Sequence, residues 1–168
     1  MKNLTLTAFC ALFMAFFAVS CASKTAATGT GTSTVAKKGL NGSWILTDIQ
    51  FDGIPKGSKV SIFDEAPYQC FIGSQWDFIS NNNKGSYTIT STDNGCNTLT
   101  QPIIWSIVQE NGASLFQFKK IFNGDKAKNV TTGYKVTVSD VEATTMTWRA
   151  VVGFQGQTGY LVYTFQRK

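Results

Sequence analysis

The chain has 168 residues, of which 43% are hydrophobic and 15% charged, and it contains no histidine. Without imidazole, the sequence excludes Ser-His-Asp and Cys-His nucleophiles, histidine-bearing zinc sites and histidine-ligated haem. Four of the 15 basic residues precede Leu40 and the other 11 are balanced by all 10 acidic residues, so we expect no basic face and no nucleic-acid partner.

Residues 1–20 have the layout of an export signal, with Lys2 followed by an apolar stretch to Val19. The stretch is too short for a comfortable membrane span. The junction Ala18-Val19-Ser20-Cys21 resembles the lipobox of bacterial lipoproteins, in which the cysteine receives a lipid and becomes the new N-terminus. The resemblance implies a lipid attachment at Cys21 that anchors the protein to the cell envelope. No acidic run follows Cys21, as it does in some surface-displayed lipoproteins, so we expect an anchor at the outer membrane facing the periplasm. An ordinary signal peptide cleaved nearby is the alternative.

Residues 21–39 are expected to form a flexible tether after the lipidated cysteine. Residues 22–39 are small or polar, with Val and Lys and no aromatic side chain, and such a composition cannot bury enough surface to fold. If Cys10 leaves with the signal and Cys21 takes lipid, Cys70 and Cys96 are the two cysteines left. A lone pair in an exported protein predicts a disulfide rather than a redox or metal site.

Residues 40–168 are expected to form one all-β domain. Alternating polar and apolar residues predict eight strands, and no segment repeats its apolar residues at helical spacing. The hairpin loops include Asn111-Gly112, a strong signal for a tight turn. Eight strands joined by short loops predict an antiparallel up-and-down barrel, with a sandwich as the alternative. The expected strands are Ser43–Phe51, Gln75–Ser80, Gly85–Ser91, Pro102–Gln109, Ala113–Ile121, Gly133–Ser139, Thr144–Val152 and Gly159–Arg167.

The alternation also assigns one aromatic-rich face of each strand to the interior. Large rings line apolar pockets, and they also fill small barrels until no pocket remains, so the sequence leaves both outcomes open. If a pocket exists, the residues expected to contact its ligand are Phe78, Tyr87, Trp105, Phe116, Tyr134, Met146, Trp148 and Tyr163.

Several short motifs in a fixed order resemble a known family. Gly42-Ser43-Trp44 resembles the Gly-x-Trp motif that opens the first strand of lipocalins, where the Trp packs under an Arg after the last strand; Arg167 stands in that place here. The wider set is similar to bacterial lipocalin-like lipoproteins. It comprises Cys70, Trp76-Asp77-Phe78, Cys96, Gly133-Tyr134 and Tyr163-Thr164-Phe165. The resemblance implies a barrel whose closed end contains Trp44 and Arg167, and whose other end opens into a calyx for a small apolar molecule.

These observations predict a membrane-anchored binding protein that sequesters or transports a small hydrophobic ligand in the cell envelope. The alternative is a filled barrel that acts as a structural or protein-interaction lipoprotein without a ligand. We expect no enzyme, cofactor or metal site. Asp64 and Glu65 are adjacent and would point to opposite sides of an extended chain, while Asp77 and Arg149 would face outward as surface charges.

Overall fold

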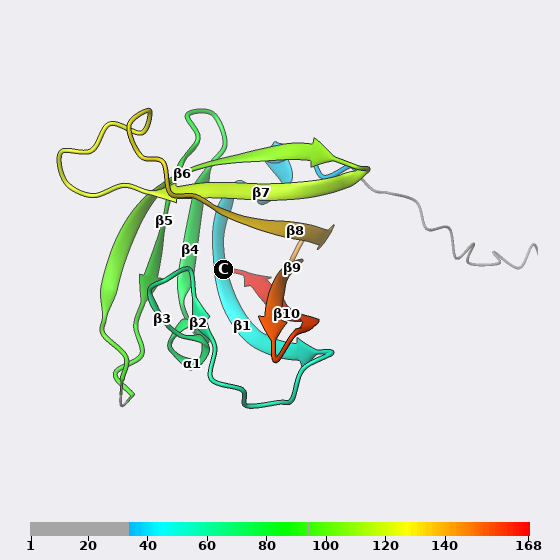
Figure 1. Cartoon of the computed structure of the whole chain (residues 1–168). Helices are drawn as coiled ribbons and strands as arrows, with labels where there is room; N and C mark the ends of the chain where they lie inside the picture. The colour runs from blue at the N-terminus through cyan, green and yellow to red at the C-terminus, as the bar shows by residue number, and fades with distance from the viewer. Residues whose placement is uncertain (1–33, 94) are drawn as a thin grey trace, which may run out of the picture. The chain divides into compact units, whose positions relative to one another are not determined.

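The structure, a computed structural model, describes residues 34–93 and 95–168, and these form a closed barrel of eight antiparallel strands (Figure 1). Each strand pairs with its neighbours in the chain, and β1 closes the barrel by pairing with both β10 and β4. The predicted up-and-down barrel is therefore confirmed, and the sandwich is wrong. The barrel strands are β1 (Gly42–Asp52), β4 (Gln75–Ile79), β5 (Lys84–Ile89), β6 (Leu99–Glu110), β7 (Ala113–Lys120), β8 (Tyr134–Val141), β9 (Thr145–Phe154) and β10 (Gln157–Arg167).

Two tight turns determine the longest hairpins. Asn111 and Gly112 have φ values of 51° and 79°, the left-handed pair that a twisted two-residue hairpin requires, and they join β6 to β7 as expected. Gln155 and Gly156 adopt the same conformation, with φ of 49° and 79°, between β9 and β10. Because this turn needs only two residues, both strands continue beyond the limits predicted at 152 and 159.

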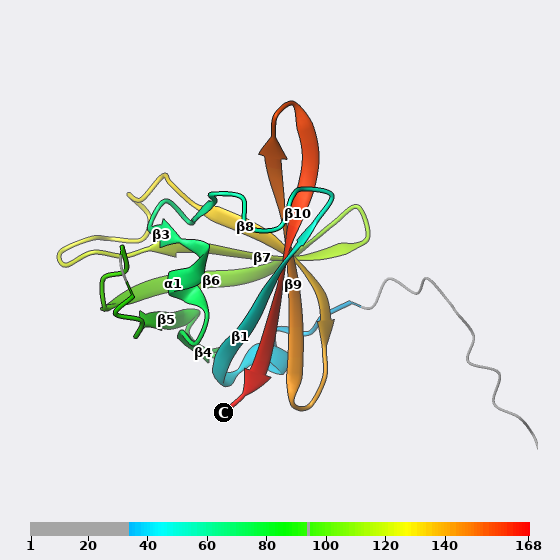
Figure 2. The same ribbon diagram turned by 90° about the horizontal axis from the view of Figure 1, so that it is seen from below.

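The connection between β1 and β4 has structure that the sequence pattern did not predict. It contains a two-stranded hairpin of β2 (Ser61–Ile62) and β3 (Ala66–Pro67), followed directly by the short helix α1 (Tyr68–Phe71). This connection runs past the lower end of the barrel in Figure 1, and α1 lies in front of β5 and β6 when the barrel is seen from below (Figure 2). The hairpin is separate from the barrel sheet.

The packed part of the chain begins before the predicted boundary at Leu40. Val35 is buried and its backbone N–H donates to the Ser114 hydroxyl at 2.9 Å, and a 3₁₀-helix, η1 (Lys37–Leu40), follows. The tether predicted to reach residue 39 therefore stops short of Val35, because this valine finds a buried position beside the β6–β7 hairpin. The rest of that segment, with Cys21 and the signal, lies outside the described residues.

The core is the inside of the barrel. The inward positions of the strands carry most of the fully buried large side chains, including all four tryptophans. The bulges that interrupt regular pairing lie at Leu46–Asp48 on β1 and at Val138–Asp140 on β8. A buried face with a period of two explains why the strands follow the predicted alternation so closely.

Candidate functional site

The barrel has two different ends. At the end where β1 begins and β10 stops, Trp44 is fully buried and the Arg167 guanidinium lies 4.1 Å from its ring centroid. The Trp44 indole donates to the Leu40 carbonyl at 2.8 Å. The structure thus brings together the two residues expected at the closed end, and η1 covers them.

Arg167 also ties separate segments together at this end. Its guanidinium donates to the backbone carbonyls of Gly39 at 2.9 Å, Asn41 at 2.7 Å and Ala143 at 2.7 Å. One side chain therefore joins the segment before β1 to the turn between β8 and β9. A planar donor group with a fixed fork is suited to this role in a way that a lysine is not.

All eight residues expected to contact a ligand lie on the inner face of the barrel. Seven are at most 2% exposed, and Tyr134 is half-buried. In the middle of the barrel the rings contact one another, with centroid separations of 5.2 Å for Phe78–Phe116, 5.6 Å for Trp105–Phe116 and 4.6 Å for Phe116–Trp148. This part of the interior is packed with side chains.

One polar atom in this packed region has no partner. Trp44, Trp76 and Trp105 each donate their indole N–H to an oxygen at 2.8–3.0 Å. The buried N–H of Trp148 has no acceptor among the described residues. Buried donors usually have a hydrogen-bond partner. A water molecule or a ligand atom that accepted from the Trp148 N–H would therefore remove the free-energy cost of leaving this donor unpaired.

The other end of the barrel is closed by the tip of the β2–β3 hairpin. Phe63 and Asp64 form its turn with φ values of 52° and 48°, and the N–H of Glu65 donates to the Ile62 carbonyl at 3.0 Å. A left-handed turn of this type normally uses Gly, Asn or Asp, so Phe63 is the unusual residue of the pair. The turn directs the Phe63 ring into the barrel, where it makes edge-on or stacked contacts with five rings.

The ring contacts of Phe63 define the mouth of the barrel. The closest is Phe118, with centroids 4.9 Å apart, followed by Tyr134 at 5.5 Å and Phe71 at 5.8 Å. Trp76 lies at 5.9 Å and Tyr163 at 6.2 Å. Two of the eight expected ligand contacts, Tyr134 and Tyr163, are therefore covered by this single side chain.

Polar contacts hold the same hairpin to the barrel. The Glu65 carboxylate accepts from the Tyr87 hydroxyl at 2.9 Å and from the Lys120 ammonium at 2.8 Å, and the Tyr134 hydroxyl donates to Asp64 at 3.3 Å. The Lys120 and Glu65 side chains are only 11% and 19% exposed. The expectation that Asp64 and Glu65 point to opposite sides of an extended chain is therefore wrong, because the chain turns tightly here and both carboxylates accept hydrogen bonds from tyrosines at the mouth.

The tyrosines of the mouth stay protonated. Burial raises the pKa of Tyr87 far above its usual value, and the Glu65 carboxylate beside its hydroxyl raises it further. Burial likewise raises the pKa of Tyr163, and for Tyr134 burial and Asp64 outweigh the opposing effect of Lys120. The Tyr87 and Tyr134 hydroxyls are therefore protonated at neutral pH and donate to Glu65 and Asp64.

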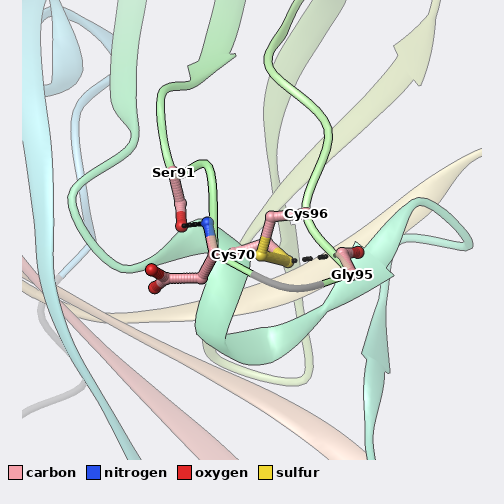
Figure 3. The surroundings of a disulfide bond; sticks show 5 residues. Cys70, Ser91, Gly95 and Cys96 are labelled. Atoms are coloured by element: carbon pink, nitrogen blue, oxygen red, sulfur yellow. Dashed lines mark hydrogen bonds between the residues drawn. A yellow bond between two sulfur atoms is a disulfide. The ribbon is translucent and has the colours of Figure 1, made fainter.

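The predicted disulfide is confirmed and lies next to the hairpin. Cys70 in α1 bonds to Cys96 in the β5–β6 connection, with Cα atoms 5.4 Å apart (Figure 3). Cys70 is 1% exposed, and Phe71 beside it packs against Phe63 and Tyr87. The bond thus fixes the base of the β2–β3 hairpin while the turn at its tip has no covalent link to the barrel.

A hollow of about 170 Å³ adjoins the Phe63 ring. It lies between the β2–β3 hairpin and strands β8 to β10, and Tyr134, Val136, Leu161 and Tyr163 line it. A larger hollow of about 430 Å³ includes the outward residues Ile104, Gln117 and Lys119. Both hollows reach expected ligand contacts, Tyr134 and Tyr163 at the mouth and Trp105 and Tyr134 in the larger one, but only the hollow at the mouth is lined by Phe63.

The sequence patterns did not identify three residues of this site, Phe63, Glu65 and Lys120. Phe63 precedes two acids in a connection without strand-like alternation, and Lys120 belongs to a basic pair at the end of a strand. The run Phe63-Asp64-Glu65, with its ring next to two carboxylates, is the only local signal. Lys120 meets Glu65 across 55 residues of chain, which no local pattern reveals.

Comparison of the chain with protein-family models, with curated proteins and with solved structures finds no match in any of the three. The resemblance to lipocalin-like lipoproteins therefore stays a prediction that rests on the motifs. In the part of the chain that the structure describes, no helix is long and apolar enough to cross a membrane. Within the same residues, no three Cys, Asp or Glu side chains gather as they would around a metal ion.

Proposed function

We propose that this domain binds a small apolar molecule at the end of the barrel that the β2–β3 hairpin closes, without catalysis. The observation that carries the proposal is the Phe63 ring, which enters the barrel from a loop and occupies a space surrounded by Phe71, Trp76, Phe118, Tyr134 and Tyr163. Rings surrounded by rings are typical of sites for flat or chain-like apolar groups.

The mouth offers the combination that small-molecule sites use, an apolar lining with a few directed polar groups. The lining is aromatic, and the donors are the Tyr87 and Tyr134 hydroxyls and the Lys120 ammonium. A hollow is already present beside Phe63. Retracting one side chain would join the space that this side chain fills to that hollow.

We further propose that the protein acts in the cell envelope, held there by lipid on Cys21. The export-like residues 1–20, the junction before Cys21 and the disulfide support this location. Replacing Cys21→Ala should move the protein from the membrane fraction to soluble or unprocessed material. Cys10→Ala is the matched control, because Cys10 lies inside the expected signal. Unchanged fractionation of the Cys21 variant would contradict the anchor.

Ligand-dependent stabilisation tests the binding proposal. A ligand that binds only the folded state raises its apparent stability, by about 2.7 kcal/mol at a concentration 100 times its Kd. We would titrate the purified full chain in lipid nanodiscs with fatty acids, fatty alcohols and aromatic compounds, following the thermal unfolding midpoint. Tyr134→Ala removes a ring at the mouth, on β8. Tyr160→Ala is the control, because it removes a half-buried ring on β10 that does not belong to the mouth.

We expect saturable stabilisation of the wild type and of the Tyr160 variant, and weaker stabilisation of the Tyr134 variant. A second candidate function is a filled barrel that works through its outer surface, and the packed rings of Phe78, Phe116 and Trp148 favour it. The absence of saturable stabilisation across the whole panel would refute the binding proposal and favour this second candidate.

A further inference from the structure

We propose that the tip of the β2–β3 hairpin occupies the ligand site when no ligand is bound, and that the ligand is an apolar molecule carrying one carboxylate. This inference rests on the proposed function and specifies its ligand class. In the closed barrel, the Phe63 ring occupies the apolar part of the site and the Glu65 carboxylate occupies the polar part. The ligand and the hairpin would bind in alternation.

Phe63 fills the apolar part of the proposed site. Its ring contacts rings from β4, β7, β8, β10 and α1 at once, although its own backbone belongs to none of them. The ring is half-buried rather than fully enclosed, and a hollow lies beside it. A phenyl ring or a hydrocarbon chain of similar width matches this space.

The Lys120 ammonium forms the polar part of the proposed site. Glu65 is its ion-pair partner, and the Lys120 side chain is 11% exposed, so water solvates it poorly. A neutral ligand that displaced the hairpin would leave a buried ammonium without a counter-ion, which is strongly unfavourable. A ligand carboxylate would restore the ion pair and would also accept from the Tyr87 hydroxyl, as Glu65 does.

The tip of the β2–β3 hairpin is held to the barrel less firmly than its base. The β2–β3 ladder has only two residue pairs, Ser61–Pro67 and Ile62–Ala66, and it shares no ladder with the barrel. Phe63 and Asp64 adopt left-handed conformations, which are disfavoured for a bulky residue such as Phe63. The disulfide at Cys70 holds the base in place. A short, strained tip on a fixed base can leave the mouth without unfolding the barrel.

The test compares matched acids and alcohols. We would measure the binding of 4-phenylbutanoate and 4-phenylbutanol, and of decanoate and decanol, to the full chain in nanodiscs by calorimetry, with empty nanodiscs as the blank. Phe63→Ala removes the internal ring, and Phe122→Ala, at a site 60% exposed on the β7–β8 connection, is its control. Lys120→Gln removes the buried ammonium, and Lys119→Gln, its neighbour on the same strand, is its control.

We expect the acids to bind at least tenfold more tightly than their alcohols. Phe63→Ala should tighten the binding of both by removing a competitor. In the Phe63→Ala protein, the additional change Lys120→Gln should reduce the ratio of acid to alcohol affinity about tenfold or more, because the acid loses one charged hydrogen bond and the alcohol no longer leaves a buried ammonium without a counter-ion. The variants at 119 and 122 should match their parent proteins.

Each failure has a separate meaning. If no compound binds any variant, the proposed function itself is refuted. If acids and alcohols bind equally and Lys120→Gln has no effect, the barrel is a binder but the ligand class inferred here is wrong. If wild type binds and Phe63→Ala binds no better, the hairpin does not compete. Should Phe63→Ala fail to fold, Glu65→Gln preserves the ring and must still tighten acid binding; unchanged affinity would overturn the inference.

Discussion

Removal of the Cys70–Cys96 disulfide should destabilise the domain substantially. The bond joins residues that are 26 apart in sequence, and in the chain-entropy model a loop of this length contributes about 3.5 kcal/mol to the free energy of unfolding. Cys70 is 1% exposed, so Cys70→Ala also leaves a small buried void, which adds to the loss. Domains are typically stable by only about 5–15 kcal/mol, so this change is large.

Urea unfolding of the Cys70→Ala/Cys96→Ala double variant of the full chain, followed by tryptophan fluorescence, measures the effect. With the slopes typical of small proteins, the midpoint should fall by roughly 1–3.5 M relative to the oxidised wild type. Thiol reductant should shift the wild type in the same direction and leave the double variant unchanged. A loss of less than about 1 kcal/mol would refute the loop-closure reasoning, and free thiols in the exported wild type would refute the bond itself.

Three further predictions concern the core and the two ends of the barrel. Trp44→Ala should cost about 3–5 kcal/mol in urea unfolding, because it empties a fully buried position, and a cost below about 1 kcal/mol would contradict its role in the core. Arg167→Lys keeps the charge but loses donors to three carbonyls, so a loss of about 1–3 kcal/mol is expected, and an unchanged midpoint would show that these bonds do not support the closed end. Because folding raises the pKa of Tyr87 and Tyr163, the unfolded state releases their protons first, so the stability that these two phenols contribute should be constant below about pH 10 and should fall above it. Ultraviolet titration of the phenols in the folded chain would refute this if all five tyrosines ionised together at the value of free tyrosine.

The barrel strands could be predicted because each has one buried face. Residues such as Trp105 and Ile107 on β6, or Leu161 and Tyr163 on β10, repeat with the period of two that the pleat requires. A slip of one residue would expose the entire apolar set, so the pattern determines the register as well as the existence of the strand. The turn at Asn111-Gly112 adds a local signal of the same kind.

The hairpin at the mouth could not be predicted, because its structure depends on contacts made far along the chain. Strands of two residues are too short for any periodicity to appear. Phe63 has little intrinsic preference for a positive φ, and tertiary contacts impose this conformation. Val35 is a similar case. It is a single apolar residue in a run of small ones, and no local pattern indicates that it is buried or that its N–H donates to the Ser114 hydroxyl.

The left-handed turn at Phe63 and Asp64, which the sequence did not predict, also bears on the proposed ligand binding. A left-handed Phe63 costs about 1–2 kcal/mol, a cost absent from any conformation in which the turn relaxes, whereas Asp tolerates this region better. The ring contacts of Phe63 and the ion pair of Glu65 with Lys120 must offset it. The net preference for the closed mouth is therefore smaller than those contacts alone would provide, and a ligand that reproduces them without the strain competes favourably. Backbone conformations that a residue intrinsically disfavours cluster at active sites and ligand-binding sites, and Phe63 at the mouth has such a conformation.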